Sequence, residues 1–380
     1  MNLLRYSGRL PRSCLPSKRS FTVLAIESSA DDTGVAIVTS SRQILSNVVK
    51  KQHTVHEKFG GIHPREAVYA HQENIGHAVR EALADANMQA HEVDGIAFTR
   101  GPGMPGCLGV GSSAARTLAA ALNKPLVGVH HMQAHALTAL LTSTPESRPT
   151  FPFLTLLVSG GHTLLLLAIS QTSFRILATT SDASIGRVID KVSRMLKLPW
   201  SSSFGPGAAL EDFCRPVSEG ESVEFDVPAF SKAVPGVMAF SFSGLHSAVE
   251  RYITTKGIDN LNLGTRRAVA REFQRAAVAQ LEDKIALGLN YCQREGIDIR
   301  HLVVSGGVAS NAFLRERLQI CVSNASTASP ISLVFPPPSL CTDNAVMIAW
   351  ASMYRFLAGD FDDYSILISP EWSIENLDSP

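Results

Sequence analysis

FTVLAIESSADDTGVAIV (residues 21–38) and FPFLTLLVSGGHTLLLLAI (residues 151–169) have the same form. Each contains an apolar run, a short polar turn and a second apolar run, which is the pattern of a β-hairpin. The two hairpins begin about 130 residues apart. This repetition predicts that each hairpin opens one of two similar halves of the chain.

Further strand and helix patterns follow each hairpin. We predict helices at 64–86, 109–123, 184–197 and about 265–293, and strands within 93–103 and from His301 onward. Strands that alternate with helices predict an α/β fold, here duplicated. The region 199–243 is rich in Pro, Gly and Ser and predicts an insertion loop.

Three histidines lie close together in GVHHMQAHALTALL, residues 128–141. If a helix follows the strand-like run before them, His131 and His135 lie one turn apart on one face, which is the spacing of two metal ligands. The pair matches the zinc signature His-Glu-x-x-His in spacing only, because Met132 follows His131. An alternative is that these histidines only cap or fill a helix start.

A third ligand is needed to decide between these readings. CTDN, residues 341–344, leaves a Pro-rich loop and enters an apolar helix. A carboxylate is a natural third ligand beside two imidazoles, and Asp343 is the candidate. Alternatively, Thr342 or Asp343 is an ordinary helix N-cap.

Two Gly-rich turns follow strand-like runs, in LLVSGGHT (156–163) and LVVSGGVASN (302–311). Backbone N–H groups without a nearby Cβ are what a phosphate requires, so both turns are candidates for a nucleotide site. Neither fits the Rossmann or P-loop pattern. Positive φ in a tight hairpin is the alternative explanation for Gly160 and Gly161.

The composition, 45% hydrophobic and 18% charged, with no apolar run of membrane-spanning length, indicates a globular protein and not a membrane protein. Residues 1–20 carry five basic residues, several serines and no acid, which predicts a mitochondrial transit peptide. Without those five, 29 basic residues face 34 acidic ones. A nucleic acid partner would therefore need a local basic patch.

Eight motifs in the same order resemble the universal tRNA threonylcarbamoyladenosine transferase family, in its mitochondrial branch. They are IESSADDT, GGIHPREA, GPG, HHMQAH, LLVSGGHT, FSFSGL, SGGVASN and CTDN. The resemblance implies the duplicated actin-like, sugar-kinase-like, Hsp70-like (ASKHA) fold, with two lobes around a nucleotide cleft. It places lobe I at 21–150, lobe II at 151–342, a helix at 343–358 that packs back on lobe I, and a C-terminal tail at 359–380.

The resemblance also implies roles for individual residues. The metal ligands would be His131, His135 and Asp343. The donor would contact Leu157, Val158, Ser159, Gly160, Gly161, Asp190, Gly207, Glu211 and Asn311. Many relatives have Glu where this chain has Gln133, so the carboxylate that they carry at this position is missing here while the ligands remain. Asp31 and Asp32 would face the cleft as catalytic groups, with an Asx-turn as the alternative.

The function implied is transfer of a threonylcarbamoyl group from threonylcarbamoyl-AMP to N6 of the adenosine 3′ of the anticodon. The substrates would be tRNAs that read codons beginning with A, in the mitochondrial matrix. One divalent metal per subunit, zinc, iron or magnesium, would polarise the donor. The mitochondrial branch further implies a homodimer.

Basic side chains at helical spacing are candidates for tRNA phosphate contacts. They are Lys191, Arg267, Arg271 and Arg275, with a solvated helix face as the alternative. Three other functions remain open at this point: a metalloprotease, a small-molecule kinase of the same fold, and a non-enzymatic mitochondrial nucleoid or binding protein.

Overall fold

The first half of the chain forms a five-stranded mixed sheet in a computed structural model, which describes residues 20–59, 61–200, 205–215, 227–230, 234–325 and 329–377. Its strands are β1 (Thr22–Glu27), β2 (Thr33–Thr39), β3 (Ile44–Lys50), β4 (Gly95–Gly101) and β5 (Leu126–His130). They lie in the order β3-β2-β1-β4-β5. β1 runs antiparallel to β2, which runs antiparallel to β3, whereas β1, β4 and β5 are parallel.

The second half repeats this sheet. Its strands are β6 (Phe153–Val158), β7 (Thr163–Ala168), β8 (Phe174–Thr179), β9 (His301–Ser305) and β10 (Ser332–Val334). The order is β10-β9-β6-β7-β8, with β6 antiparallel to β7, β7 antiparallel to β8, and β6, β9 and β10 parallel. Each strand has a counterpart in the first sheet, so the chain contains the same five-stranded unit twice.

Helices cover both faces of the first sheet. On one face lie α2 (Pro64–Asp85) and α3 (Pro105–Leu122), and the short α1 (His53–His56) precedes α2. Leu24, Ile37 and Phe98 are fully buried in the cluster on this face. On the other face lie α4 (His131–Thr142) and α11 (Ala345–Ala358). Every residue of β1 and β2 is therefore buried, as expected for strands covered on both sides.

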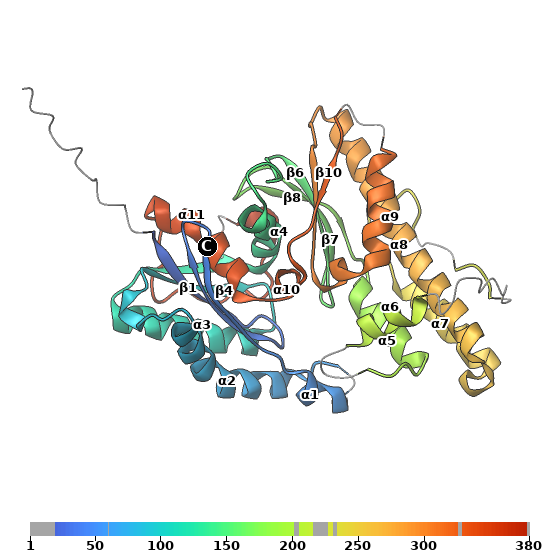
Figure 1. Ribbon diagram of the computed structural model, residues 1–380, viewed down its shortest axis with the longest axis horizontal. Helices are drawn as coiled ribbons and strands as arrows, with labels where there is room; N and C mark the ends of the chain where they lie inside the picture. Colours follow the sequence, from blue (N-terminus) through green and yellow to red (C-terminus); the bar gives the residue numbers. More distant parts are fainter. Residues whose placement is uncertain are drawn as a thin grey trace, which may run out of the picture.

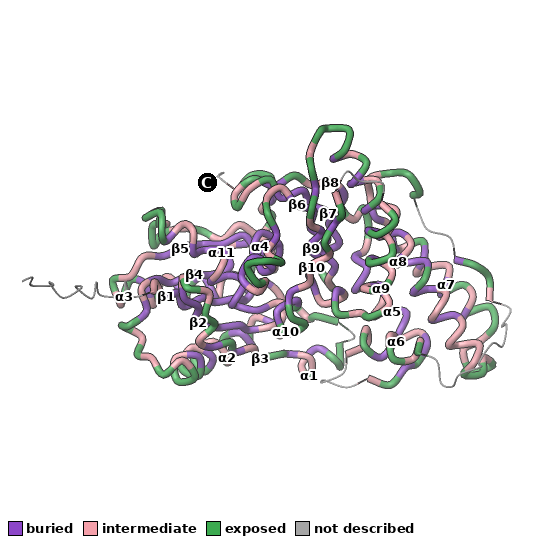
Figure 2. Tube along the Cα trace, turned by 45° about the horizontal axis from the view of Figure 1, so that its top comes forward, coloured by how far each residue is buried: buried purple, intermediate pink, exposed green. Residues whose placement is uncertain are grey.

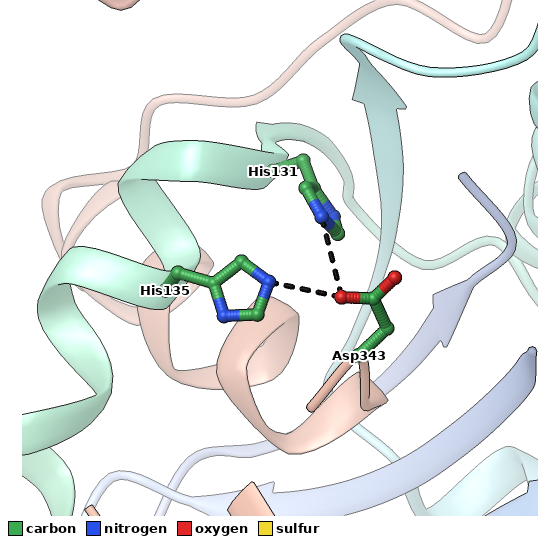
Figure 3. Close-up of side chains that lie close together, drawn as sticks. All are labelled: His131, His135 and Asp343. Carbon is green, nitrogen blue, oxygen red and sulfur yellow. Dashed lines mark hydrogen bonds and ion pairs between the residues drawn. The ribbon is translucent and has the colours of Figure 1, made fainter. Parts of the chain in front are cut away.

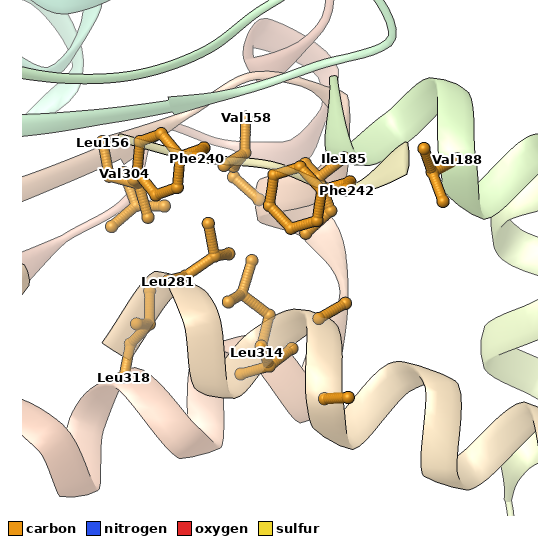
Figure 4. Packing of buried hydrophobic residues seen from close by; sticks show 14 of the residues in the cluster. Leu156, Val158, Ile185, Val188, Phe240, Phe242, Leu281, Val304, Leu314 and Leu318 are labelled. Carbon is orange, nitrogen blue, oxygen red and sulfur yellow. The ribbon is translucent and has the colours of Figure 1, made fainter. Parts of the chain in front are cut away.

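The second sheet packs on its outer side against the remaining helices. These are α5 (Ile185–Met195), α6 (Pro206–Cys214), α7 (Ser243–Lys256), α8 (Leu263–Arg294) and α9 (Ala312–Ser323). α8 contacts β7, α6, α7 and α9. Figure 4 shows Leu156 of β6 with Phe240 near Leu281 of α8, and Leu314 of α9 below Phe242. This apolar cluster holds the helices in place on the sheet.

α4 lies between the two sheets (Figure 1), and α11 packs on α4 and on the first sheet. One apolar cluster joins Val23 and Ala25 of β1, the buried side of both helices, and Phe153 and Leu157 of β6. Figure 2 shows buried residues concentrated in the two sheets and in these two helices. The N-terminus of α4 and the loop between α10 (Pro338–Cys341) and α11 consequently meet near the junction of the two halves.

The C-terminal segment at 359–377 returns across both halves. The backbone N–H of Asp362 donates to the carbonyl of Leu126 on β5 at 2.8 Å. Farther on, the N–H of Ile176 on β8 donates to the Glu375 carboxylate at 2.8 Å. We call residues 359–377 the C-terminal strap, because they contact an outer strand of each sheet.

The insertion 199–243 is not all loop, because residues 206–214 form α6. The sequence did not predict this helix because a Pro-Gly pair usually indicates a turn. Pro206 is at the first helical position, where its missing N–H costs nothing.

The predicted transit peptide lies outside the described residues except for Ser20. Within the described residues, no helix combines the length and apolarity needed to cross a bilayer.

Candidate functional site

His130, the first of the three histidines, has a structural role. It is the N-cap of α4, where its Nδ1 accepts the backbone N–H groups of Met132 and Gln133 at 3.2 and 3.4 Å. Its Nε2 donates to the Trp372 carbonyl of the C-terminal strap at 3.0 Å. Burial lowers the pKa of His130 to about 3, so the ring is neutral and both nitrogens are occupied.

The other two histidines meet Asp343 (Figure 3). The Nε2 atoms of His131 and His135 lie 3.5 and 3.0 Å from the same oxygen, Oδ1, of Asp343. The ligand atoms of all three residues lie within 4.8 Å of one another. Residues from the first half and from near the end of the chain are thus brought together, as the sequence predicts.

The alternative that Asp343 only caps α11 does not hold. The cap is Asn344, whose side-chain oxygen accepts the N–H of Met347 at 3.0 Å. Asp343 precedes this cap, and its carboxylate faces the two imidazoles. The residue following Asp343 supplies the helix cap, which leaves Asp343 free for another role.

The geometry of this cluster fits a metal ion. Two ligand atoms about 2.1 Å from one ion lie about 3.0–3.4 Å apart in tetrahedral or octahedral geometry. The Nε2 atoms of His131 and His135 lie 3.5 and 3.0 Å from the Asp343 oxygen. Two imidazole nitrogens and a carboxylate form a donor set that suits zinc or a divalent iron or manganese ion and leaves coordination positions open.

Glu27, which the sequence did not single out, supports His131. It ends β1 and is buried, with its Oε2 3.2 Å from His131 Nδ1. The Ser29 backbone N–H and the Thr99 hydroxyl also donate to this carboxylate. Since Nδ1–H points to Glu27, Nε2 is the His131 nitrogen that faces Asp343 and is left to bind a metal ion.

Gln133 therefore leaves His131 without a carboxylate from its own helix, but not without one altogether. Gln133 points away and donates to the Gln171 carbonyl at 2.8 Å, while Glu27 approaches from the other side. A buried Glu that ends an apolar strand was the available signal. Burial lowers the pKa of His131, but the charges of Glu27 and Asp343 outweigh it and raise the pKa to about 10. In the metal-free cluster this ring is cationic.

We expect Glu27→Gln to bind a divalent metal about 10-fold more weakly, because supporting residues of this type contribute about 10–100-fold to affinity. The amide keeps the shape and can still accept from Ser29, but it removes the charge beside His131. Competition titration with a fluorescent chelator measures the change. Glu81→Gln, at an exposed Glu paired with Lys50 on the same lobe, is the control and should leave metal affinity unaltered. Equal affinity in both variants would contradict the supporting role.

Asp31 and Asp32 lie in the turn after β1. His71 of α2 supports this turn: its Nε2 donates to the Ala30 carbonyl at 2.9 Å, and its Nδ1 accepts from the Thr33 hydroxyl at 2.7 Å. Burial, followed by the charges of Asp31 and Asp343, raises the pKa of Asp32 to about 8. The pKa of Asp31 is also raised, first by burial and then by Asp343. At neutral pH the pair retains a proton.

Asp32→Asn should stabilise the metal-free chain, and more so at higher pH. Between the ordinary pKa of 3.8 and the folded value of about 8, the unfolded chain releases the Asp32 proton while the folded chain keeps it, so stability falls as pH rises. An amide is neutral in both states and avoids this loss. We expect the variant's thermal midpoint to exceed that of the unaltered chain at pH 7.5 and to approach it near pH 4.5. A difference independent of pH would contradict the assignment.

The first Gly-rich turn, residues 159–162, has an open surface. A Cβ added at Gly160 or Gly161 would meet no atom within 4 Å, and neither glycine is among the positive-φ residues. Hairpin geometry therefore does not explain them. The turn is closed by a hydrogen bond from the Ser159 N–H to the His162 carbonyl at 2.8 Å. Exposed backbone N–H groups without Cβ atoms form the type of surface that a phosphate approaches.

The second Gly-rich turn serves a different purpose. Gly306 has φ +99°, and a Cβ there would lie 2.2 Å from the Val158 carbonyl oxygen. Only glycine allows β9 to end this close to β6. The two Ser-Gly-Gly motifs are thus not equivalent: the first leaves space for a ligand, and the second allows close packing.

α5 contacts the first Gly-rich turn at one end and carries Asp190, the next residue predicted to contact the donor. Ser184, its N-cap, donates from its hydroxyl to the Gly160 carbonyl at 2.6 Å. One and a half turns along α5, the Asp190 carboxylate accepts the N–H of Gly207 on α6. Burial raises the pKa of Asp190 to about 6, against the charge of Arg194 and the Gly207 hydrogen bond.

α6 in turn contacts α9. The Glu211 carboxylate accepts the backbone N–H of Ala312 at 2.8 Å. Asn311 is the N-cap of α9 and accepts the N–H of Leu314 at 2.9 Å. Contacts thus run from the first Gly-rich turn through Asp190 and Gly207 to Glu211 and Asn311. Leu157 and Val158, which precede the turn, are buried in β6.

His162, in the first Gly-rich turn, lies near the cluster of His131, His135 and Asp343. Its ring centroid lies 6.5 Å from that of His131. Burial, then the charge of His131, lowers the pKa of His162 to about 4, so the ring is neutral. The sequence contained this residue in the Gly-rich motif, but nothing in the sequence placed it beside His131.

The three arginines of α8 that are candidates for tRNA contact form hydrogen bonds within the protein. Arg267 and Arg271 donate to the last two carbonyls of α6 at 3.0 and 2.8 Å. Arg275 donates twice to Glu272 at 2.7 and 2.6 Å. Arg267 and Arg271 thus hold the end of α6, a role the sequence pattern did not reveal. Phosphate contact by these arginines, and by the exposed Lys191, stays a prediction.

The model of the tRNA N6-adenosine threonylcarbamoyltransferase family matches residues 43–350. A probable mitochondrial tRNA N6-adenosine threonylcarbamoyltransferase of Arabidopsis thaliana is 38% identical, over 93% of this chain and 75% of that one. The mitochondrial enzyme of that name in Schizosaccharomyces pombe is 36% identical, over 95% and 88%. The enzyme of that name in Rickettsia bellii is 36% identical, over 93% and 99%.

Solved structures resemble the fold at low sequence identity. Full-length HypF, in a phosphate- and nucleotide-bound form, matches with a TM-score of 0.53 and 12% identity, over 90% of this chain and 56% of that one. Component A of (R)-2-hydroxyglutaryl-CoA dehydratase from Acidaminococcus fermentans matches with a TM-score of 0.50 and 13% identity, over 89% and 100%. With the repeated sheets, these matches confirm the predicted duplicated α/β fold of the actin-like, sugar-kinase-like, Hsp70-like class.

Proposed function

The chain belongs to the tRNA N6-adenosine threonylcarbamoyltransferase family, and from this premise we propose the donor, the metal and the acceptor of its transfer reaction. The donor is threonylcarbamoyl-AMP. The acceptor is N6 of the adenosine directly 3′ of the anticodon in mitochondrial tRNAs that read codons beginning with A. The observation that carries the proposal is the meeting of His131, His135 and Asp343 beside the open Gly-rich turn.

His131, His135 and Asp343 would hold one divalent metal ion. When bound, it would polarise the carbonyl or phosphate oxygens of the donor. Glu27 orients His131 from behind, and Asp343 faces both imidazoles. Zinc, iron and magnesium are the candidates, and the two imidazole ligands favour the first two.

The donor would lie along the series of contacts that leads away from this cluster. Backbone N–H groups at Gly160 and Gly161 would bind its phosphate and acyl part. Asp190 and Glu211 would meet the ribose hydroxyl groups, Gly207 would line the nucleotide, and Asn311 would lie by the base. The order of these residues, from the cluster to α9, matches the order acyl group, phosphate, ribose, base.

The donor is a mixed anhydride and is already activated, so placement and charge stabilisation contribute more than a protein nucleophile. The N6–C bond forms as the bond between the carbamoyl carbon and the phosphate oxygen breaks. AMP leaves with that electron pair. The N6 proton passes to the Asp31–Asp32 pair, which holds one proton and one negative charge at neutral pH because two adjacent carboxylates do not both ionise.

The acceptor base is accessible without melting a duplex, because bases of an anticodon loop are unstacked. The names of two relatives, and the basic, acid-free residues 1–20, support a mitochondrial location. We place the enzyme in the matrix with its tRNA substrates, as a homodimer. The protease and non-enzymatic alternatives find no support in the family membership, and the kinase alternative shares only the fold.

A transfer assay tests the proposal. The chain from Phe21 onward is incubated with a divalent metal, threonylcarbamoyl-AMP and a tRNA that reads an A-initial codon, and the digested nucleosides are separated by mass. We expect threonylcarbamoyladenosine, and none with a tRNA that has G at the acceptor position. Absence of product with zinc, iron and magnesium alike overturns the proposal. ATP-dependent phosphorylation of a small molecule instead would support the kinase.

A further inference from the structure

Two exposed aromatic side chains lie at the start of α2. They are Phe59, in the short helical turn Glu57–Phe59, and Tyr69 on α2, and they are 46% and 43% exposed. The Phe59 ring stacks on the ring of His63, the residue before α2, with centroids 4.5 Å apart. The aromatic platform, as we name this surface, consists of Lys58, Phe59, His63, Arg65 and Tyr69.

Both exposed rings of the platform carry a cation. Lys58 Nζ lies 5.4 Å from the centre of the Phe59 ring, and the guanidinium carbon of Arg65 lies 5.3 Å from the centre of the Tyr69 ring. Residues 50–69 contain four basic and two acidic residues, whereas residues 21–380 contain more acid than base. Rings flanked by cations suit a polyanion with flat bases better than the apolar face of a protein.

Buried polar contacts hold the platform in place. The His63 backbone N–H donates to His56 Nδ1 at 3.2 Å, and His56 Nε2 donates to the side-chain oxygen of Gln52 at 3.0 Å. Gln52 in turn donates to the Ala67 carbonyl of α2 at 3.4 Å. Both His56 and Gln52 are buried. These hydrogen bonds join α1 to the first turns of α2, so the platform is positioned before a ligand binds.

The platform lies beside the turn that carries Asp31 and Asp32. His71 of α2 donates to the carbonyl of Ala30, the residue before Asp31. Burial raises the pKa of Asp31, and the charge of His56 acts against this shift. His56 thus lies close to Asp31 and also contacts the platform. A ligand on the platform is therefore next to the two carboxylates.

We propose that the aromatic platform binds the unpaired bases of the tRNA anticodon loop. Phe59 and Tyr69 would stack on bases, and Lys58 and Arg65 would contact phosphates. The inference rests on the proposed function, in which an adenosine of this loop is the acceptor. Stacking tolerates any base, so the platform would hold different tRNAs while the acceptor amine reaches the Asp31–Asp32 pair.

A second copy of this chain is the competing occupant of the platform. A two-fold interface places a surface patch against the same patch of the partner. Lys58 and Arg65 would then lie near their own counterparts, and like charges repel. The cations over the rings therefore favour RNA over a second subunit at this surface.

Fluorescence anisotropy of a hairpin RNA with the sequence of an anticodon stem and loop tests the proposal on the chain from Phe21 onward. Phe59→Ala and Tyr69→Ala should each weaken binding about 5-fold or more, the effect of losing one stacked base. Tyr69→Phe keeps the ring and should bind within about 2-fold of the unaltered chain. Phe361→Ala removes a ring of similar exposure, 48%, from the C-terminal strap and is the control.

Two further measurements separate stacking from phosphate contact. A fully paired RNA duplex has no unstacked bases, so Tyr69→Ala should not change its binding. Arg65→Gln should lower the slope of log affinity against log salt concentration by about 1. Thermal unfolding shows whether each variant folds, and Arg65→Gln, at an exposed position, tests the surface if a ring variant does not.

Unchanged hairpin binding in both ring variants overturns the inference, as does an equal loss for hairpin and duplex. Ring variants that bind the hairpin normally but dissociate a dimer in sedimentation would show a subunit interface, which also overturns it. If the unaltered chain still forms threonylcarbamoyladenosine in these cases, the proposed function stands. Hairpin binding that is lost in the ring variants, without product from the unaltered chain, would support the platform and overturn the proposed function.

Discussion

Purified Asp343→Asn protein is expected to bind a divalent metal more than about 100-fold less tightly than the unaltered chain, since even a supporting residue contributes about 10–100-fold. The carboxylate oxygen lies 3.0 Å from His135 Nε2 and 3.5 Å from His131 Nε2, so its loss removes one of three ligands. The same variant should lose threonylcarbamoyl transfer. Elemental analysis after dialysis against a buffered metal solution measures occupancy, and the transfer assay measures activity.

Two further variants make this result specific. His135→Ala removes a different ligand and should reduce metal occupancy in the same way. His91→Ala changes an exposed histidine in the short helical turn before β4 and should leave occupancy and transfer unaltered. Full metal affinity in both Asp343→Asn and His135→Ala would exclude the cluster as a metal centre. Lost occupancy with full transfer would show that the reaction does not need the ion.

Gly306→Ala is expected to destabilise the chain by about 3 kcal/mol or more, the combined effect of an unfavourable backbone conformation and a steric clash. Gly306 has φ +99°, and its new Cβ would lie 2.2 Å from the backbone oxygen of Val158. Because Val158 ends β6 and Gly306 directly follows β9, neither can move without disturbing the β6–β9 pairing. Chemical denaturation followed by circular dichroism measures the loss.

The neighbouring glycine provides a matched control. A Cβ at Gly307 would be 3.6 Å from Thr342, an ordinary contact, and its φ is not positive. Gly307→Ala should therefore change the unfolding free energy by less than about 1 kcal/mol. Similar stability of the two variants would show that the close approach of β9 to β6 does not require glycine at position 306.

Much of the fold could be predicted because the hairpins have strong periodic patterns. β1, β2, β6 and β7 are buried throughout, so their apolar runs are unbroken and easily recognised. The third antiparallel strands, β3 and β8, were missed because they are only partly buried and polar residues such as Asn47 and Arg175 interrupt their apolar runs. α6 was missed because a Pro-Gly start resembles a turn.

The candidate site was predicted only as far as local spacing and family resemblance reach. The spacing of His131 and His135 indicates a shared helix face, but the pattern could not tell an Asp343 ligand from an N-cap. That choice depended on Asn344 taking the cap. Glu27 acts through a contact with His131, which lies 104 positions away along the chain. Local sequence does not encode such distant partners, so only the folded chain reveals them.

α11 and the C-terminal strap have a consequence for biosynthesis. The inner face of the first sheet packs against a helix that begins at residue 345, and Asp343 comes just before that helix. A ribosome has therefore made more than nine tenths of the polypeptide before this apolar surface acquires its cover. Because of this connectivity, the N-terminal lobe cannot complete its fold before the second lobe has been synthesised. Any cation that Asp343 holds would be bound only after this late residue has been synthesised, and until α11 follows it the apolar face of the first sheet lacks that cover.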